Sequence, residues 1–459
     1  MARRPVANPD APHVLIVGGG YVGLYTALRL QKKLKSELKR GEVKVTIVDP
    51  QSYMTYQPFL PEAAAGNLSP RHVVVPLRRV LPKIDIVTAR VTELSHSERW
   101  AIIQPVEGPP QRLTYDYLVM AAGSVSRTLP IPGLAENGIG FKTIGEAIHL
   151  RNHVLGQLDI AGSTDDEELR KKALTFVVVG GGFAGIEALA EMEDMARDAI
   201  KMYPNLRADD MRWVMVEASD RILPEVGPEL GRWTAEQLRG RGIEVKLKTF
   251  LTSAVDKQIE LSDGESFPTN TLVWTAGAKA NPLAKSTDLP VDERGRVKGN
   301  EFLQIEGTVR AFTAGDNAAI PDLTKEGEFC APNAQHAVRQ AKVLAENLVA
   351  ALRGKSLKPY RHAYVGSVAG LGLHKGVAHV YGIKQRGFAA WFMHRTYHLS
   401  RVPTFNRKVR VVADWTLALF FKRETVSLGS IEQPRQEFVL AAAADRPAEE
   451  PGMVKSASK

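Results

Sequence analysis

A strand-like run followed by the pattern Gly-x-Gly-x-x-Gly occurs twice in this chain, and no other feature restricts the fold as strongly. The two sets of glycines are Gly18, Gly20 and Gly23, and Gly180, Gly182 and Gly185. In such a unit the first glycine permits a tight turn from strand to helix. The second lets a phosphate approach the backbone, and the third lets the helix pack on the strand. Two units predict an α/β fold with two Rossmann-like dinucleotide-binding domains.

Each glycine turn is followed by a second apolar run that ends in an acid. Residues 43–48 lead to Asp49, and the run "WVMVE" ends at Glu217. A carboxylate at the end of this second strand can bind the ribose hydroxyls of a dinucleotide. Both acids come later than the usual ~20 residues after the glycines, which longer helices would explain. The alternative is that one or both turns pack a sheet without a ligand.

The positions of the two units divide the chain into segments. The strand-like stretches "YDYLVMAAGS" and "VRAFTAGDNAAI" flank the second unit, so we expect the second domain to be inserted into the first. The predicted segments are residues 1–150 (first domain, first part), 151–281 (second domain), 282–385 (first domain, second part), 386–433 (C-terminal amphipathic helices) and 434–459 (a Pro-, Ala- and charge-rich tail, expected to be disordered).

Cysteine content and hydropathy exclude several classes of protein. Cys330 is the single cysteine, which excludes an internal disulfide framework, a CxxC redox pair and a cysteine zinc site. Redox chemistry would therefore depend on a bound cofactor, Cys330 is expected to be a packing thiol, and no metal is expected. No apolar region follows the basic start, and no run of about 20 apolar residues occurs, so we expect neither a signal peptide nor a membrane-spanning helix.

Basic residues are concentrated late in the chain. Residues 384–424 carry nine Lys and Arg against Asp414 and Glu424, in a chain of net charge +9. Five apolar side chains are predicted to share one helical face: Val411, Val412, Trp415, Ala418 and Leu419. The apolar run 411–421 is too short to span a bilayer but suits a headgroup layer. The alternative is a soluble helical pair on the core or at a dimer interface; nucleic-acid binding is not expected, since no recognition motif is present.

The motifs resemble those of a known family. The first turn, "YDYLVMAAGS", the second turn and a late "TAGD" occur in this order in two-dinucleotide-binding flavoproteins. Within them the chain is most similar to the type II NADH dehydrogenases, which are single-chain NADH:quinone oxidoreductases. Three segments carry that similarity: "YQPFLPEAAAG" (56–66), "NAQHAVRQ" (333–340) and the C-terminal residues 389–415.

The resemblance assigns the first turn to non-covalent FAD. Gly18, Gly20 and Gly23 would then face the pyrophosphate, with Asp49 on the adenosine ribose. Asp316 would bind the ribitol or pyrophosphate end, Gly123 would keep a strand end flat against the nucleotide, and Ala334 and Gln335 would lie at the flavin edge. The alternative for Asp316 is a helix N-cap, and for Gly123 a simple turn glycine.

The second turn would bind NADH through Gly180, Gly182 and Gly185. Glu217 would accept hydrogen bonds from both ribose hydroxyls and repel a 2′-phosphate, so NADH is expected to be preferred over NADPH. By resemblance Glu187 lies between nicotinamide and flavin, and Ala276 and Gly277 line the nicotinamide cleft. The alternative for Glu187 is that it only complements the helix dipole. The alternative for Ala276 and Gly277 is a turn where the chain crosses between domains.

The resemblance also implies a quinone substrate, either menaquinone or ubiquinone. Gln335 is the first candidate to bind it, with Gln340 as a second neutral hydrogen-bonding group. His336 would supply a proton, because imidazole titrates near neutral pH; the alternative is a packing histidine. Glu187 and Gln335 are thus the expected catalytic residues.

The expected activity is hydride transfer from NADH to FAD, then two-electron reduction of a membrane quinone without proton pumping. The enzyme would lie peripherally on the cytoplasmic face of the membrane, with a homodimer left open. Two alternatives are a soluble NADH-dependent flavoprotein reductase with a protein acceptor and an NADH-binding redox sensor.

Overall fold

The first of two large sheets contains both parallel and antiparallel strands. The computed structural model describes residues 8, 10–363, 365–421, 423–428, 434–436 and 438–439. The sheet has seven strands in the order β20-β8-β1-β2-β5-β6-β7. Their bounds are β1 His13–Val17, β2 Lys44–Asp49, β5 Asp85–Ser95, β6 Trp100–Pro105, β7 Gln111–Thr114, β8 Tyr117–Met120 and β20 Ala311–Thr313. β1, β2, β5, β8 and β20 run parallel, whereas β6 and β7 form an antiparallel extension of β5.

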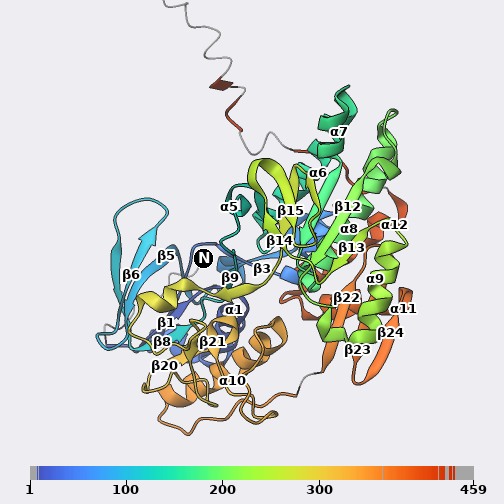
Figure 1. The fold of residues 1–459 in the computed structure, drawn as a ribbon. Helices are drawn as coiled ribbons and strands as arrows, with labels where there is room; N and C mark the ends of the chain where they lie inside the picture. The colour runs from blue at the N-terminus through green and yellow to red at the C-terminus, as the bar shows by residue number, and fades with distance from the viewer. Residues whose placement is uncertain are drawn as a thin grey trace, which may run out of the picture.

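The second sheet has five parallel strands in the order β10-β17-β11-β12-β13. Their bounds are β10 Gly138–Gly140, β11 Thr175–Val179, β12 Arg212–Glu217, β13 Glu244–Leu247 and β17 Thr271–Trp274. β11 and β17 are buried at every position. Continuous apolar runs of this kind are typical of parallel strands covered on both faces. The two sheets form the cores of the two lobes in Figure 1.

The chain crosses between the lobes through short strand pairs and helices. β9 (Ser124–Ser126) pairs antiparallel with β18 (Ala278–Ala280), so the two segments that connect the lobes run side by side. Smaller pairs and sheets are β3 (Tyr53–Thr55) with β4 (Val74–Pro76), β14 (Leu251–Ser253) with β15 (Gln258–Leu261) and β16 (Ser266–Pro268), and β19 (Val297–Lys298) with β21 (Ala318–Ala319).

Helices cover both sheets. They are α1 Tyr21–Lys33, α2 Lys35–Arg40, α3 Leu60–Ala64, α4 Leu77–Val80, α5 Leu134–Asn137, α6 Ile144–Ser163, α7 Glu167–Ala173, α8 Phe183–Ala199, α9 Pro228–Arg239 and α10 Ala334–Leu352. α1 packs closely against α10, although the two are far apart in the sequence. α8 begins directly after β11, as α1 does after β1, so both glycine turns sit where a strand gives way to a helix.

The C-terminal part packs beside the second lobe. β22 (Gly366–Gly370), β23 (Gly376–Val380) and β24 (Ile383–Arg386) form an antiparallel sheet that contacts α8 and α11 (Phe388–Arg401). α12 (Phe405–Phe420) follows. Figure 1 shows these elements next to α8 and α9, away from the seven-stranded sheet.

The predicted apolar face of the last helix is divided in the structure. Val411 is fully buried and Trp415 packs on the core, whereas Val412 and Leu419 are exposed. Among the described residues, no helix combines the length and hydropathy needed to cross a bilayer. Most of the tail predicted at 434–459 lies outside the described residues.

Candidate dinucleotide and redox site

The first glycine turn has the close approaches that its sequence pattern predicts. Gly18 has a φ of +102°, and a Cβ there would collide with the Ala121 carbonyl. A Cβ on Gly23 would collide with the Gly18 carbonyl. Gly20 differs, because a Cβ on this N-cap residue of α1 would meet nothing within 4 Å. The turn is therefore closed toward the protein and open at the helix N-terminus.

The second glycine turn repeats this arrangement. Gly180 has a φ of +111° and lies against the backbone of Thr275 and Ala276, with the nearest atom 2.7 Å from an added Cβ. A Cβ on Gly185 would collide with the Gly180 carbonyl, while Gly182, the N-cap of α8, faces open space. Neither α1 nor α8 has an acid in its first turn, so each helix N-terminus can receive an anion.

The two acids also occupy equivalent places. Asp49 Oδ2 accepts a hydrogen bond from the Gly19 amide at 2.6 Å, and Glu217 Oε2 accepts one from the Gly181 amide at 2.5 Å. Each carboxylate thus lies beside its glycine turn, as a ribose-binding acid must. Burial raises the pKa of Asp49, although hydrogen bonds from two backbone amides oppose the shift.

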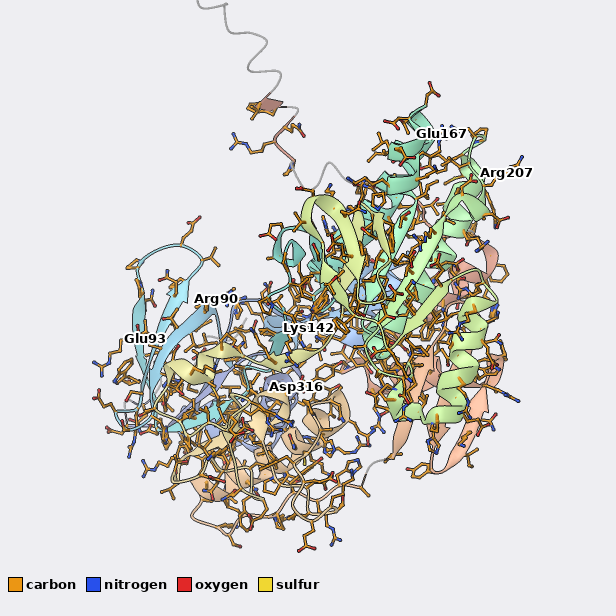
Figure 2. All side chains as sticks on the ribbon, viewed as in Figure 1. Arg90, Glu93, Lys142, Glu167, Arg207 and Asp316 are labelled. Carbon is orange, nitrogen blue, oxygen red and sulfur yellow. The ribbon has the colours of Figure 1, made fainter. Side chains whose placement is uncertain are left out.

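A polar chain links the two lobes near the end of β8. Lys142 Nζ donates to Ser124 Oγ at 2.8 Å, and Ser124 Oγ donates to Asp316 Oδ2 at 2.7 Å. Figure 2 shows Lys142 and Asp316 close to the junction of the lobes. Burial lowers the pKa of Lys142, while Asp316 and Glu146 oppose the shift. The sequence interpretation missed Lys142; its only local signal is the capping box Thr143–Glu146 that follows.

Other predicted residues lie around this junction. Gly123 has a φ of +68° and donates its amide to Asn317 Oδ1 at 3.0 Å. Asp316 lies in the 3₁₀ turn Gly315–Asn317 and caps no helix. Gly277, with a φ of +98°, and the half-buried Ala276 follow β17 next to the Gly180 turn.

The predicted quinone residues lie at the start of α10 and have different surroundings. Gln335 Oε1 accepts from His362 Nε2 at 3.0 Å and from the Val365 amide at 3.2 Å. Gln340 is 1% exposed, and its Oε1 accepts from the Gly315 amide at 2.7 Å. His336 Nδ1 lies 2.8 Å from the Tyr360 hydroxyl. Gln340 thus fixes the turn that carries Asp316, and Ala334 is the exposed first residue of the helix.

Glu187 belongs to a series of buried titratable groups. Its Oε1 accepts from the Gly370 amide at 2.8 Å and lies 3.0 Å from His394 Nε2. The His394 ring lies 4.6 Å from that of His398, whose Nδ1 is 3.2 Å from the Tyr56 hydroxyl. Burial would lower the pKa of His394, but the charge and hydrogen bond of Glu187 outweigh it and raise the pKa. Burial lowers the pKa of His398 well below its usual value.

Two further carboxylates share a small cavity with Glu187 and His394. Glu62 Oε2 accepts from Arg395 of α11 at 2.9 Å and from the Trp415 indole of α12 at 2.7 Å. Glu191 Oε2 accepts from Asn67 Nδ2 at 2.9 Å. The C-terminal helices are therefore joined to the same acidic region that contains Glu187.

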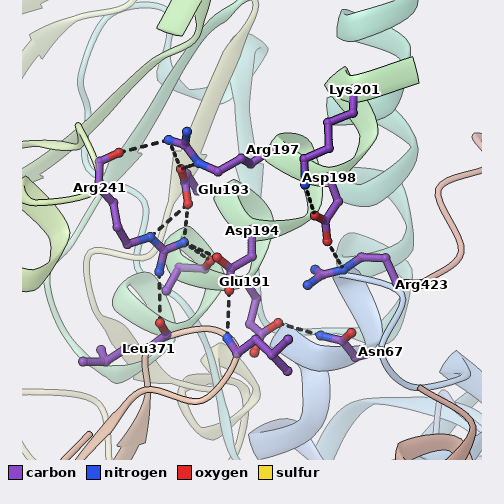
Figure 3. A network of polar contacts seen from close by, with 12 residues as sticks. Asn67, Glu191, Glu193, Asp194, Arg197, Asp198, Lys201, Arg241, Leu371 and Arg423 are labelled. Carbon is purple, nitrogen blue, oxygen red and sulfur yellow. Dashed lines mark hydrogen bonds and ion pairs between the residues drawn. The ribbon is translucent and has the colours of Figure 1, made fainter. Parts of the chain in front are cut away.

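A second polar network fixes the helix that carries Glu187. Figure 3 shows Arg241 between Glu193 and Asp194 of α8, with a further bond of 3.0 Å to the Leu371 carbonyl. The Leu373 amide donates to Asp194 at 2.8 Å. These contacts tie the β22–β23 turn to α8, and so hold the Gly370 amide against Glu187.

The residues present fit a dinucleotide at each turn, and the resemblance described above assigns FAD to the first turn and NADH to the second. In both places a narrow glycine turn meets an open helix N-terminus, with a carboxylate beside it. A dinucleotide needs this combination of a pyrophosphate site and a ribose acceptor. The fold and the site together define an oxidoreductase with two dinucleotide sites.

Comparison with known proteins agrees with this class. The pyridine nucleotide-disulphide oxidoreductase family matches residues 12–341. A type II NADH:quinone oxidoreductase of Staphylococcus aureus is 30% identical over 389 residues, which are 84% of this chain and 93% of that protein. The type II NADH:quinone oxidoreductase Ndh of Mycobacterium tuberculosis is 28% identical over 92% of this chain and 91% of its own.

A solved structure, NDH2 from Plasmodium falciparum in complex with NADH, shares the fold with a TM-score of 0.82 at 19% identity. The match covers 91% of this chain and all of that one. The chain belongs to the type II NADH:quinone oxidoreductases within the pyridine nucleotide-disulphide oxidoreductase family. The family, the enzyme class, the α/β fold and the nucleotide cofactors expected from the sequence are confirmed. The domain boundaries, the individual site residues and membrane docking remain predictions.

Proposed function

We propose that this chain oxidises NADH and reduces a quinone at a membrane surface, with FAD bound at the Gly18–Gly23 turn. The observation that carries the proposal is the pair of equivalent turns, each with an open helix N-terminus and an acid at hydrogen-bonding distance from a turn amide. FAD, when bound, supplies the ring that accepts a hydride and releases electrons. The protein contributes binding, orientation and proton control.

The nicotinamide half of the site is proposed to use the second turn. Gly182 and the N-terminus of α8 would bind the NADH pyrophosphate, and Glu217 would bind its adenosine ribose. Ala276 and Gly277 would line the nicotinamide cleft. Because Glu217 is negative, it would repel the 2′-phosphate of NADPH, which supports a preference for NADH.

The flavin half would use Gly18, Gly20 and Gly23 for the pyrophosphate and Asp49 for the ribose. Gly123 and Asp316 lie where the polar chain from Lys142 reaches the end of β8. Lys142 is a cation held between the lobes, so we assign it to neutralise Asp316 and fix its carboxylate.

Glu187 is proposed to orient the reacting groups between the two sites. Its Oε1 is fixed by the Gly370 amide and by His394, so the carboxylate has one geometry. His394 can hold a proton beside Glu187, because its pKa is raised. This pair would supply a proton when the quinone is reduced. Ala334 and Gln335 would face the quinone, while His336 and Gln340 would support the helix that carries them.

The C-terminal helices are proposed to dock on the membrane and admit the quinone. Large apolar side chains are exposed along α11 and α12 and in the residue after them: Phe388, Phe392, Phe405, Val409, Val412, Leu417, Leu419, Phe420 and Phe421. Basic residues accompany them, which suits an anionic leaflet. The proposed location is the cytoplasmic face, as a peripheral protein.

The test is an anaerobic titration of the purified, FAD-loaded protein with NADH, followed by re-oxidation with ubiquinone and menaquinone analogues. We expect reduction by one equivalent of NADH and rapid re-oxidation by at least one quinone. Re-oxidation by a ferredoxin alone, or a single slow reduction without turnover, would instead support the protein-acceptor enzyme or the redox sensor.

Glu187→Gln provides a test of the site itself. It should slow turnover at least tenfold, as expected for a group that handles a proton or orients reactants. Glu168→Gln, a change of the same chemistry at a 79% exposed side chain, is the matched control. Equal activity of the two variants would contradict the role proposed for Glu187.

A further inference from the structure

Three side chains of different donor type meet where the hairpin 321–329 joins the start of α10. Asp322, Cys330 and His336 each offer one ligand atom, and these atoms lie within 4.8 Å of one another. Pro321 and Phe329 form an antiparallel bridge, so the hairpin returns the chain and brings Cys330 back beside Asp322. The sequence interpretation expected no metal and treated Cys330 as a packing thiol.

All three side chains are already oriented by hydrogen bonds, and the bond that Cys330 Sγ donates to the Pro321 carbonyl at 3.7 Å would be lost when the thiol proton leaves. Asp322 Oδ1 accepts from the Thr324 amide at 2.9 Å and from the Thr324 hydroxyl at 2.7 Å, which leaves Oδ2 as the oxygen for a ligand. His336 is 4% exposed, and its Nδ1 contacts the Tyr360 hydroxyl at 2.8 Å. A metal-bound histidine usually has such a partner on its other ring nitrogen.

We propose that Asp322, Cys330 and His336 bind a divalent cation of the zinc type, with water as the fourth ligand. Carboxylate oxygen, thiolate sulfur and imidazole nitrogen are all ligands of Zn²⁺, at about 2.0–2.3 Å. Soft thiolate disfavours Mg²⁺ and Ca²⁺, which prefer oxygen. When the cation binds, the thiol of Cys330 releases its proton to the solvent and binds as a thiolate. The ring nitrogen Nε2 of His336 is the third protein ligand.

The hairpin provides both the adjustment and the access that the site needs. Donors around a tetrahedral zinc lie less than 4.8 Å apart, so any pair of ligand atoms at this upper limit would close by about 1 Å. Residues 323–329 are exposed and Asp322 is half-buried, so the hairpin can move toward the buried side chains of Cys330 and His336. An open hollow of ≈ 590 Å³, lined by residues 321–329, gives a cation and a water molecule access to Asp322, at the edge of the site.

A cation here would join the hairpin to the first turn of α10. That turn carries Ala334 and Gln335, which the proposed function places at the quinone. We therefore expect Zn²⁺ to slow quinone reduction without slowing the reduction of bound flavin by NADH. This consequence rests on the proposed function, whereas the binding itself does not, so the two are measured separately.

Binding is tested on the FAD-loaded full chain by the reactivity of its single thiol. Cys330 is the only cysteine, so labelling by a disulfide reagent reports on one site. One equivalent of Zn²⁺ should slow labelling at least tenfold, whereas Mg²⁺ should not. Zinc-edge X-ray absorption should show one sulfur ligand at about 2.3 Å. A zinc shell of nitrogen and oxygen alone, or unchanged labelling, would overturn the proposal.

Matched variants separate this site from non-specific binding. Asp322→Asn keeps the size of the side chain and should weaken Zn²⁺ binding at least tenfold in competition with a chromophoric chelator. Asp256→Asn makes the same change at an exposed acid and should leave binding unchanged. Equal weakening by both variants would overturn the proposal. Loss of Zn²⁺ binding in Asp322→Asn with normal NADH:quinone turnover would support the site independently of the proposed function.

Discussion

Burial raises the pKa of Glu191 to about 7, and the charge of Glu62 adds to the shift. In the unfolded chain the pKa of this carboxyl is near its ordinary value of 4.5. Between these two values the folded protein holds a proton that the unfolded chain has lost. The free energy of unfolding should therefore fall as pH rises, by up to about 1.4 kcal/mol per pH unit.

Glu191→Gln should remove this contribution. The variant should lose stability less steeply than the wild type between pH 5 and pH 7 and be the more stable protein at pH 8. Its amide oxygen can still accept from Asn67. Urea unfolding at several pH values measures the difference, with Glu168→Gln as the exposed control. A variant whose stability keeps the wild-type dependence on pH would show that Glu191 does not titrate in this range.

Glu217 should decide between NADH and NADPH. Glu217→Gln removes the charge that would repel a 2′-phosphate and weakens a charge-assisted hydrogen bond to the ribose. Such bonds are worth about 1.5–3 kcal/mol, so the NADH-to-NADPH ratio of kcat/KM should fall roughly tenfold or more. Asp49→Asn is the matched change in the other turn and should lower FAD retention without altering this ratio. If Glu217→Gln keeps the wild-type preference for NADH over NADPH, the carboxylate does not determine that preference.

At the scale of elements, one buried ion pair contributes strongly to the attachment of α11. Arg395 pairs with Glu62 at 2.9 Å, and both side chains are largely buried, at 11% and 5% exposed. The guanidinium also lies over the rings of Trp391 and Trp415, at 4.3 and 4.8 Å. Removing one partner leaves a buried carboxylate without its cation, which typically costs about 3–5 kcal/mol.

Arg395→Met should therefore lower the thermal midpoint strongly. Lys384→Met is the matched control, because its pair with Glu229 is 43% and 59% exposed and such pairs contribute about 0–1 kcal/mol. Differential scanning calorimetry of both variants measures the contrast. If the double variant Arg395→Met with Glu62→Gln is more stable than Arg395→Met alone, the loss of stability came from the unpaired charge and not from lost packing.

The elements that depend on local pattern could be predicted from the sequence. The two glycine turns and the strands that precede them are fixed by residues within a few positions of each other, and β1 and β11 lie where the apolar runs place them. The acids Asp49 and Glu217 could be placed for the same reason. The position of each helix N-terminus, directly after its glycine turn, could also be predicted.

Contacts between distant segments could not be predicted in this way. Glu187 meets His394 from α11, and Gln340 bonds the turn before Asp316, but neither residue has a local signal for its partner. The inward and outward residues of α12 also differ from a simple helical face, because Val411 is buried in the core and Trp415 bonds Glu62 of α3, whereas Val412 and Leu419 are exposed. Tertiary packing decides these orientations, and periodicity alone gives only the presence of a helix.

At the scale of the whole molecule, the proposed proton-handling pair and the proposed docking surface lie on neighbouring elements. α11 presents His394 inward to Glu187 and Phe388 and Phe392 outward, at 61% and 57% exposed. One helix therefore connects the proposed docking surface to the proposed proton-handling pair.

Phe405→Ser with Phe420→Ser should separate the two functions. These side chains are 80% and 77% exposed, so the change removes apolar area from the proposed docking surface without opening the core. Burial of apolar area and attraction to anionic lipid both contribute to interfacial binding. The double variant should float less with anionic vesicles and reduce a long-chain quinone in them more slowly, yet keep wild-type turnover with a water-soluble quinone.

Val309→Ser, at a 78% exposed residue far from these helices, is the control. Equal flotation of wild type and double variant would place the membrane contact elsewhere, whereas parallel losses with both quinones would mean that the helices support the active site and not docking.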